Sequence, residues 1–283
     1  MNKQEYILFI FEGKVTEKII FKNLKQYFLD KKEIKFSQDI VISYGTVIYK
    51  LYKDFFIDDE LDDDLDLVTL LKPKNDKKEI INVEEVSEVY LFFDYDGHAS
   101  NADDDKLLKM LNLFNDETDK GKLFVSYPMV EALRNIKTND NFSQTIAISE
   151  QKYKKEYSKN CDEKFLHFND YTKKIWLELI MQHSKKANFI VNGEFQFPDK
   201  QIKQFEIFNQ QKIKYIETFN KVSVLSGFPM FLLAYYGLDK FNNDFFKEQA
   251  SLILEADDEK EILSILKNEK FTFNEDFKNK FDL

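Results

Sequence analysis

The feature that most constrains the fold of this chain is a series of short apolar runs, each followed by a turn and an amphipathic segment. Residues 6–11 (YILFIF) form one continuous apolar run, which is typical of a strand buried on both faces of a parallel sheet. The next four residues (EGKV) predict a turn, and Thr16 is placed to cap a helix with apolar residues at helical spacing. Comparable strands are predicted at 40–43, 89–93 and 123–125.

Helix-like segments separate these strands. Residues 47–56 and 106–114 predict two helices, and Pro128 stands near the start of another, which would include Glu131. Residues 57–88 are first acidic and then basic, which predicts an exposed excursion from the core. The alternation of strand and helix predicts an α/β fold with a doubly wound, Rossmann-like parallel sheet flanked by helices.

The second half of the chain has a mainly helical pattern. Apolar residues recur at three- and four-residue spacing in 171–183, 201–219 and 245–254. Residues 188–197 contain Asn192-Gly193, a favoured hairpin turn, and therefore predict a β-hairpin. The sequence thus predicts two domains, an α/β domain over 1–138 and a mainly helical C-terminal domain over 139–283.

Cysteine content and hydropathy predict a cytoplasmic protein without membrane segments. Cys161 is the only cysteine, which excludes an internal disulfide framework and a zinc site built on clustered thiolates. The apolar run near the N-terminus is too short for a signal peptide core. Residues 222–236 are strongly apolar but too few to span a membrane, and Gly227 and Pro229 interrupt them. We expect a buried helix there that docks the helical region on the α/β domain.

The charge of the chain bears on its partners. The formal net charge is −10, and a uniformly acidic surface repels polyphosphates, which argues against simple non-specific nucleic-acid binding. The acid is concentrated in residues 54–66, whereas residues 152–186 are rich in lysine. A local basic face in the second half is therefore compatible with the sequence.

Acidic residues follow two of the predicted strands at the point where each strand ends. Glu12 and Asp94 come directly after apolar runs, and Asp96 lies two residues further on, in the same direction if the segment is extended. If the first and third strands are neighbours, their carboxyl ends bring the three carboxylates together at one sheet edge. Oxygen ligands favour Mg²⁺ or Mn²⁺, and phosphate esters are the usual substrates of such sites. The sequence therefore predicts a metal site for phosphate-ester chemistry.

Three motifs follow one another along the chain: FIFEGKVTEKIIF at 9–21, DYDG at 94–97 and SYPMVEAL at 126–133. In this order they resemble the Toprim domain, the metal-binding module of topoisomerases, primases and OLD-type nucleases. The first and third are similar to motifs of RloB-like Toprim proteins, which are associated with bacterial phage defence. The resemblance spans residues 6–135.

The resemblance implies a Toprim-like nuclease that uses Mg²⁺ or Mn²⁺ to hydrolyse phosphodiester bonds in DNA or RNA, with tRNA among the candidates. Glu12, Asp94 and Asp96 match the family's metal-binding and acid–base positions, and Glu131 matches a later acidic position that could hold a second metal. The resemblance also implies an anti-phage effector that works with a separate ABC- or OLD-type ATPase, since this chain lacks a G-x-x-x-x-G-K-[ST] loop. Homo-oligomerisation stays open. The chain lacks an obvious context for a catalytic topoisomerase tyrosine, which favours hydrolysis over strand rejoining.

Several residues near these motifs have both a functional and a structural interpretation. Glu17 lies in the first helical turn, where the helix dipole stabilises acids, and it could also support the metal site. Lys14 is either a phosphate-binding cation or a solvated turn lysine, and His98 is either a proton carrier or a polar loop residue. Helix surface or packing better explains three others: His167, His183 and Cys161.

Two other functions fit parts of the pattern. DYDG after an apolar strand also resembles the nucleophile motif of haloacid-dehalogenase-like phosphatases, in which Asp94 would be phosphorylated and Asp96 would act as acid or base. That motif normally opens its domain, whereas a strand–helix pair precedes it here, and Thr is missing after Gly97. The second alternative is a non-catalytic Toprim-like module that binds or senses a partner, which agrees with the acidic net charge.

Overall fold

The computed structural model describes residues 5–29, 37–57, 60–61, 67, 71, 85–137, 140–147 and 160–245. The chain divides into two units, Met1–Leu238 and Asp239–Leu283. The short helix α10 (Leu238–Lys240) leads into the second unit, whose described part ends with the π-helix η9 (Phe241–Phe245). Beyond Phe245, the helix predicted at 245–254 lies outside the described residues. Among the helices of the described ranges, none is both long enough and apolar enough for a membrane crossing.

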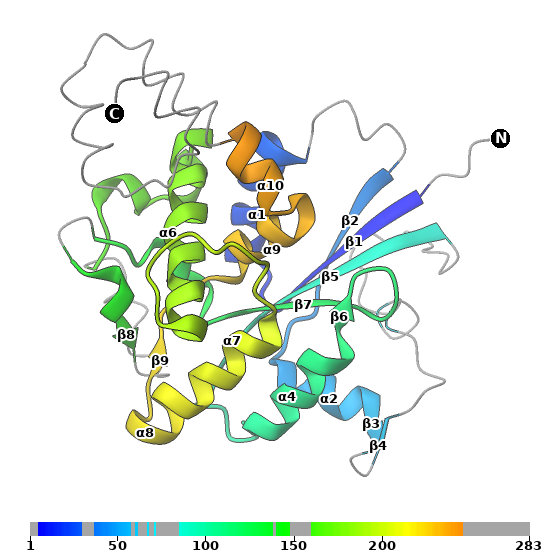
Figure 1. Ribbon diagram of the computed structural model, residues 1–283. Helices are drawn as coiled ribbons and strands as arrows, with labels where there is room; N and C mark the ends of the chain where they lie inside the picture. Colours follow the sequence, from blue (N-terminus) through cyan, green and yellow to red (C-terminus); the bar gives the residue numbers. More distant parts are fainter. Residues whose placement is uncertain are drawn as a thin grey trace, which may run out of the picture. The chain divides into compact units, whose positions relative to one another are not determined.

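The first unit is built around a five-stranded sheet (Figure 1). Its order is β2-β1-β5-β7-β6, with the first four strands parallel and β6 (Asn115–Asp116) antiparallel to β7. The parallel strands confirm the four predicted ones: β1 (Glu5–Phe11), β2 (Ser37–Ser43), β5 (Val86–Asp94) and β7 (Gly121–Ser126). The sequence does not predict β6, because a strand of two residues is too short to show a periodic pattern. The α/β class with a mostly parallel sheet is confirmed.

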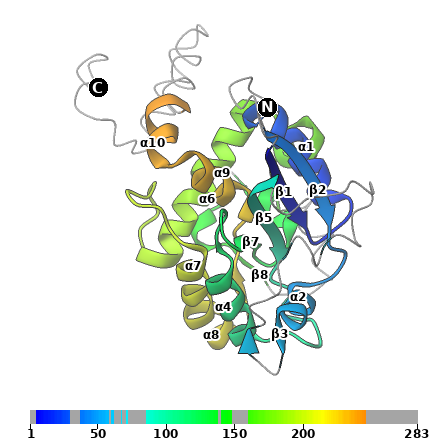
Figure 2. The ribbon, with the colours of Figure 1, turned by 90° about the vertical axis from the view of Figure 1, so that its right-hand side faces the viewer.

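Helices cover both faces of the sheet (Figures 1 and 2). One face is covered by α1 (Thr16–Phe28) and α9 (Gly227–Tyr236), and the other by α2 (Ile48–Phe55) and α4 (Asp104–Leu113). Right-handed crossovers require this arrangement, because the chain moves in one direction from β1 to β2 and in the other from β2 past β1 to β5. The predicted helices at 47–56 and 106–114 are thus confirmed as α2 and α4.

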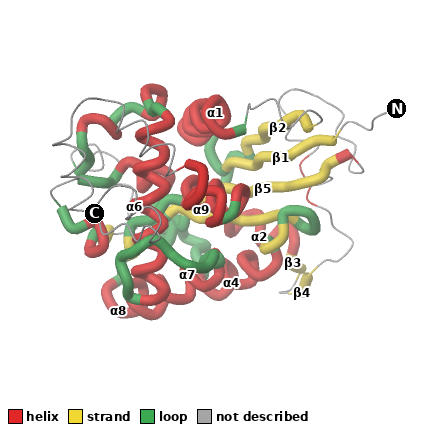
Figure 3. Tube along the Cα trace, turned by 45° about the horizontal axis from the view of Figure 1, so that its top comes forward, coloured by secondary structure: helices red, strands yellow, loops and turns green. Residues whose placement is uncertain are grey.

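An aromatic layer joins α9 to the sheet. Phe228 stacks on Phe92 of β5 with ring centroids 4.7 Å apart, and Phe231 packs against Tyr90 at 4.9 Å. Burying a phenylalanine contributes about 1.5–3 kcal/mol relative to leaving it exposed. The long helix α6 (Lys173–Asn192) packs beside α9 (Figure 3). The expectation that a buried helix within 222–236 docks the second half of the chain on the sheet is confirmed.

Residues far beyond the predicted boundary at 138 belong to the first unit. β8 (Ile146–Ala147) pairs with β9 (Val222–Ser223), and Tyr127 exchanges two backbone hydrogen bonds with Leu225, at 2.7 and 3.1 Å. These pairs connect β8 and the end of β7 to the segment that leads into α9. The boundary predicted between 138 and 139 therefore falls inside the first unit, because the sheet receives part of its cover from the second half of the chain.

The predicted hairpin at 188–197 is wrong. Helix α6 continues to Asn192, and Gly193 ends it with a φ of 82°. Asn-Gly supplies a positive φ, which a helix end uses as readily as a hairpin turn does. The helical prediction for 201–219 is confirmed by three consecutive segments: α7 (Gln204–Gln211), the π-helix η8 (Lys212–Ile216) and α8 (Glu217–Phe219).

Two other local predictions need correction. Thr16 does not cap α1, because it is itself the first helical residue and Val15 occupies the N-cap without a side-chain hydrogen bond. The helix expected after Pro128 is a single 3₁₀ segment, η3 (Val130–Arg134). Most of the excursion predicted at 57–88 lies outside the described residues. At its start, β3 (Phe56–Ile57) and β4 (Glu60–Leu61) form a small antiparallel pair.

Candidate functional site

The carboxyl ends of β1 and β5 lie side by side because the two strands are parallel neighbours. The backbone N–H of Glu12, which follows β1, donates to the carbonyl of Phe92 at 3.0 Å. The Glu12 carboxylate oxygen Oε2 accepts a hydrogen bond from the backbone N–H of Asp94, at 3.1 Å. The structure therefore brings Glu12 and Asp94 together, as the expected strand order requires.

Asp96 reaches the same edge through a sharp turn. Its φ is 44°, in the left-handed region, and its carbonyl accepts a hydrogen bond from the N–H of Ala99 at 2.9 Å. The Asp96 side chain is hydrogen-bonded to the carboxyl group of Glu12. The extended segment that we expected between Asp94 and Asp96 is wrong, because β5 ends at Asp94 and the chain turns there. The turn still brings the two side chains to one site.

Glu17 joins the cluster from the first turn of α1. Its side chain is buried, and Oε1 accepts a hydrogen bond from the backbone N–H of Gly13 at 2.9 Å. A Cβ atom on Gly13 would lie 2.5 Å from both Glu17 carboxylate oxygens, so only glycine leaves room for this contact. Gly13 therefore serves to place the Glu17 carboxylate against the turn that follows β1.

Glu131 approaches from the segment after β7. It lies in η3, is 8% exposed, and its Oε2 atom is buried without a hydrogen-bond partner among the described residues. A buried carboxylate oxygen without a donor is costly, and such atoms in native structures call for a ligand, an ion or a water. Glu131 is also close enough to Asp94 to raise the pKa of that carboxyl.

Burial and mutual repulsion dominate the electrostatics of these five carboxylates. Burial raises the pKa of Glu12 to about 8, with further contributions from Asp96 and Glu17. Burial also raises the pKa of Asp94 well above its usual range, and the four other carboxylates add to this effect. The principal charged neighbours of both groups are acids, so a proton on Glu12 reduces the repulsion at neutral pH. A hydrogen bond between the Glu12 and Asp96 side chains requires such a proton.

The donor set suits a hard divalent cation, although it is not already arranged around one. Within the described ranges, no group of three or more His, Cys, Asp and Glu side chains has an arrangement that could hold a metal ion. The carboxylate oxygens of Glu12 are turned towards the Asp94 N–H and the Asp96 side chain instead. The unpartnered Oε2 of Glu131 and the excess of negative charge both fit a cation such as Mg²⁺ or Mn²⁺. The carboxylates would have to reorient around it.

No family model, curated protein or solved structure matches this chain. Its function has to be inferred from the residues at this sheet edge.

Ser126 and Tyr49 support the site, and sequence patterns assign neither of them this role. Ser126 pairs with Asp94 in register, and its Oγ accepts a hydrogen bond from the N–H of Gly227 at the start of α9, at 3.1 Å. The Tyr49 hydroxyl, on α2, donates to the carbonyl of Tyr95 at 3.0 Å and so braces the DYDG turn. A serine or tyrosine in an apolar segment carries no signal for such contacts, because they depend on which elements pack together.

The other candidate residues lie apart from the carboxylate cluster or at its margin. Lys14 and His98 are exposed, and His98 Nδ1 lies 3.8 Å from Asp96 Oδ1. His183 is buried: Nδ1 accepts from the Ser226 N–H at 3.2 Å and Nε2 lies 3.2 Å from the Leu133 carbonyl, which identifies a structural histidine.

His167 and Cys161 lie in the segment before α6. His167 is exposed and precedes a 3₁₀ turn, so it is a loop residue and not a helical one. Cys161 is buried, and burial raises the pKa of its thiol, which disfavours a thiolate nucleophile. Neither residue contributes to the site.

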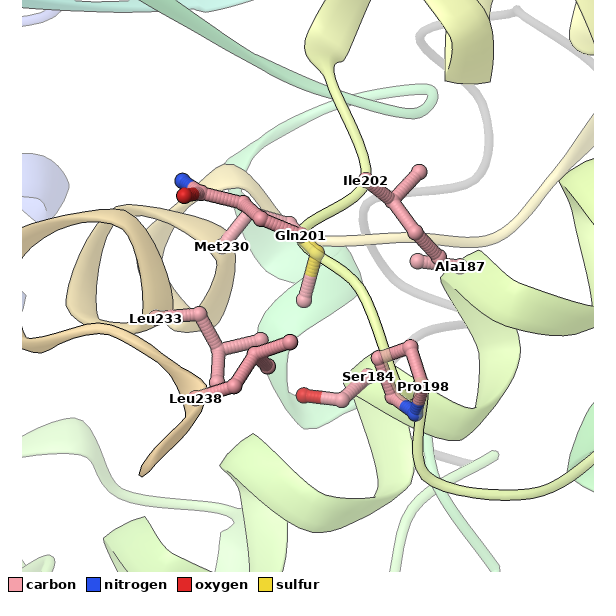
Figure 4. A pocket seen from close by; sticks show the side chains of 8 residues that line it. All are labelled: Ser184, Ala187, Pro198, Gln201, Ile202, Met230, Leu233 and Leu238. Carbon is pink, nitrogen blue, oxygen red and sulfur yellow. The ribbon is translucent and has the colours of Figure 1, made fainter. Parts of the chain in front are cut away.

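A shallow hollow, partly open to solvent, lies elsewhere in the first unit (Figure 4). Its only hydroxyl, that of Ser184, donates to the carbonyl of Ile180 in the same helix. The lining has no charged side chain and offers no group for acid–base or metal chemistry; it consists of Ser184, Ala187, Pro198, Gln201, Ile202, Met230, Leu233 and Leu238.

Proposed function

We propose that this chain is a metal-dependent nuclease that hydrolyses phosphodiester bonds in DNA or RNA. The observation that carries the proposal is the gathering of five carboxylates at one sheet edge, where burial and repulsion raise the pKa of Glu12 and Asp94. Such a cluster destabilises the fold when it is ionised, and a divalent cation relieves the repulsion. The motifs that resemble the Toprim domain fall on the same residues and support the same activity.

Each residue has a proposed role. Glu12, Asp94 and Asp96 are expected to hold the metal, and Glu131 is available for a second ion. Mg²⁺ or Mn²⁺ bound there would supply Lewis-acid activation of the phosphate. Because Glu12 must give up its proton to bind the metal, we expect a carboxylate of the cluster, Glu12 or Glu131, to take a proton from the attacking water and pass it to the alkoxide that leaves phosphorus.

The test is cleavage of plasmid DNA and total tRNA in the presence of Mg²⁺ or Mn²⁺. We expect the wild type to cleave at least one of these substrates, and chelation of the metal to abolish cleavage. The Asp94→Asn/Asp96→Asn variant should lose activity by at least about 100-fold, because the remaining carboxylates cannot hold the ion in place. The matched control is Asp119→Asn/Asp199→Asn, which removes two exposed carboxylates that lie outside the cluster and should cleave like the wild type.

The same variants separate the alternatives. A haloacid-dehalogenase-like phosphatase would release phosphate from a monoester and depend on Asp94, but it has no essential role for Glu12. Retention of that phosphatase activity by Glu12→Gln would therefore favour the phosphatase. A binding module would show neither cleavage nor metal-dependent stabilisation while remaining folded. Either result would overturn the nuclease proposal.

The proposal also covers the fold family, the location in the cell, the biological role and the partner of this chain. We propose a Toprim-like domain as the core of the first unit, a cytoplasmic location, and a role in phage defence beside a separate ATPase. The cytoplasmic location is inferred from the single cysteine and the hydropathy of the chain. The other features come from the resemblance of the three motifs, and none comes from the geometry of the site. Cleavage measured with and without a candidate ATPase tests the partnership directly.

A further inference from the structure

Lys14 stands out because none of the residues that the structure describes neutralises its charge. It lies in the turn between Glu12 and Glu17, it is exposed, and its ammonium makes no hydrogen bond or ion pair with any residue that the structure describes. Lys14 lies two residues from Glu12 and three from Glu17, and its ammonium pairs with neither carboxylate. Here the Glu17 carboxylate accepts the Gly13 N–H instead, and Glu12 binds the Asp94 N–H.

The side chain of Lys14 extends over the loop that follows β2. Its Cε lies 3.5 Å from the position that a Cβ atom on Gly45 would take. The Gly45 N–H in turn donates to the carbonyl of Glu12 at 2.8 Å, which ties this loop to the turn after β1. Lys14 is therefore exposed to solvent in the turn that joins Glu12 to Glu17, with the end of its side chain over the loop after β2.

An acidic edge alone repels the substrate that we propose for it. A phosphodiester carries a negative charge, and the five carboxylates would oppose its approach until metal and cationic side chains offset them. A lysine acts on phosphate as a flexible point charge that donates up to three hydrogen bonds. Lys14 is suitably placed, and its ammonium is not engaged by any described group.

We propose that Lys14 binds a phosphate of the nucleic-acid backbone and so holds the substrate against the carboxylate edge. This inference rests on the nuclease activity proposed above. The contact is with phosphate and not with a base, so it contributes affinity without sequence preference. Since the group contacts substrate rather than metal, its loss should raise KM much more than it lowers kcat.

The experiment compares Lys14→Ala and Lys14→Arg with the control Lys120→Ala. Lys120 lies in the β6–β7 turn, before the first residue of β7 and so at the opposite edge of the parallel sheet, and no described residue pairs with its ammonium. We expect KM for a labelled oligonucleotide to rise about tenfold in Lys14→Ala at low salt, as loss of one charge-assisted hydrogen bond predicts. The slope of log affinity against log salt should become shallower by about one. Lys14→Arg should restore both values, and Lys120→Ala should match the wild type.

The outcomes distinguish the two proposals. Equal KM values and equal salt slopes for Lys14→Ala and Lys120→Ala, in an enzyme that cleaves and depends on Asp94, would overturn the role of Lys14 alone. A loss confined to kcat would also overturn it, because a phosphate anchor acts on binding. If the folded wild type neither cleaves nor binds the oligonucleotide at low salt, both proposals fail.

Discussion

At the scale of one residue, ionisation of the buried Glu12 lowers the stability of the fold. In the metal-free protein its pKa is raised from 4.5 to about 8, so the folded state holds a proton that the unfolded state releases between these pH values. Stability is therefore greatest at the acidic end of this window and falls as the pH rises through it. A metal ion at the proposed site would have to displace this proton, so we expect metal affinity to increase with pH over the same range.

We predict that the wild type, with chelator present, loses about 2 kcal/mol more unfolding free energy between pH 5 and pH 8 than Glu12→Gln does. This magnitude allows for partial exposure of the side chain. Glutamine keeps the shape of the protonated acid and cannot ionise. Urea denaturation at several pH values measures the difference, with the exposed Glu163→Gln as control. Parallel pH profiles for the wild type and Glu12→Gln would show that Glu12 is not protonated in the fold.

Sequence predicts some members of this site and not others, for a physical reason. Glu12 and Asp94 can be predicted because they directly follow apolar strands, and parallel strands share a carboxyl edge. For Glu17, the sequence does not decide between a structural and a functional role, because its burial depends on a contact that is possible only where Gly13 has no Cβ atom. Whether Glu131 Oε2 has a hydrogen-bond partner likewise depends on how the described residues pack and cannot be recognised in the sequence.

At the scale of elements, a single amide side chain connects α1 to the segment that leads into α6. The Asn23 Oδ1 atom accepts a hydrogen bond from Trp176 Nε1 at 2.7 Å. Its Nδ2 atom donates to the carbonyls of Asn169 and Tyr171, both at 3.0 Å. Asn23 thus satisfies one donor and two acceptors from the second half of the chain.

Asn23→Ala should lower the unfolding free energy by about 3 kcal/mol, because it removes the partners of these three largely buried groups. The control is Asn112→Ala, which removes an exposed amide on α4 that bonds only within its own helix. Its effect should stay within about 0.5 kcal/mol. Urea denaturation of both variants gives the comparison. Similar midpoints for the two would mean that the Asn23 network adds no stability.

The elements themselves were predictable to different degrees. Strands buried on both faces can be recognised in the sequence as apolar runs, because every position contacts the core. The end of α6 was mistaken for a hairpin because Asn192-Gly193 suits either structure, and the choice depends on the helix that precedes it. The pairing of β8 with β9 joins two-residue strands far apart in the sequence, and so short a strand has no local pattern.

At the scale of the whole molecule, the sheet depends on α9 for one of its covers. A fragment of residues 1–138 would leave exposed the aromatic side chains that α9 buries. We predict that this fragment is insoluble, or else binds a hydrophobic dye and lacks a cooperative thermal transition. Co-expression with residues 139–283 should restore a soluble complex. A cooperatively folded 1–138 fragment with no dye binding would restore the domain boundary inferred from the sequence.

Because β7 and α9 are far apart in the sequence, α9 is synthesised several seconds after β7. At about 5–20 residues per second, residue 236 leaves the ribosome's catalytic centre roughly 5 to 20 s after residue 126. Soon after this interval begins, the last of the five carboxylates, Glu131, has been made, yet Ser126 still lacks the N–H of Gly227 and the aromatic layer is uncovered. The nascent chain therefore offers chaperones an apolar surface, and the nuclease site that we propose would stay incomplete until α9 has been made.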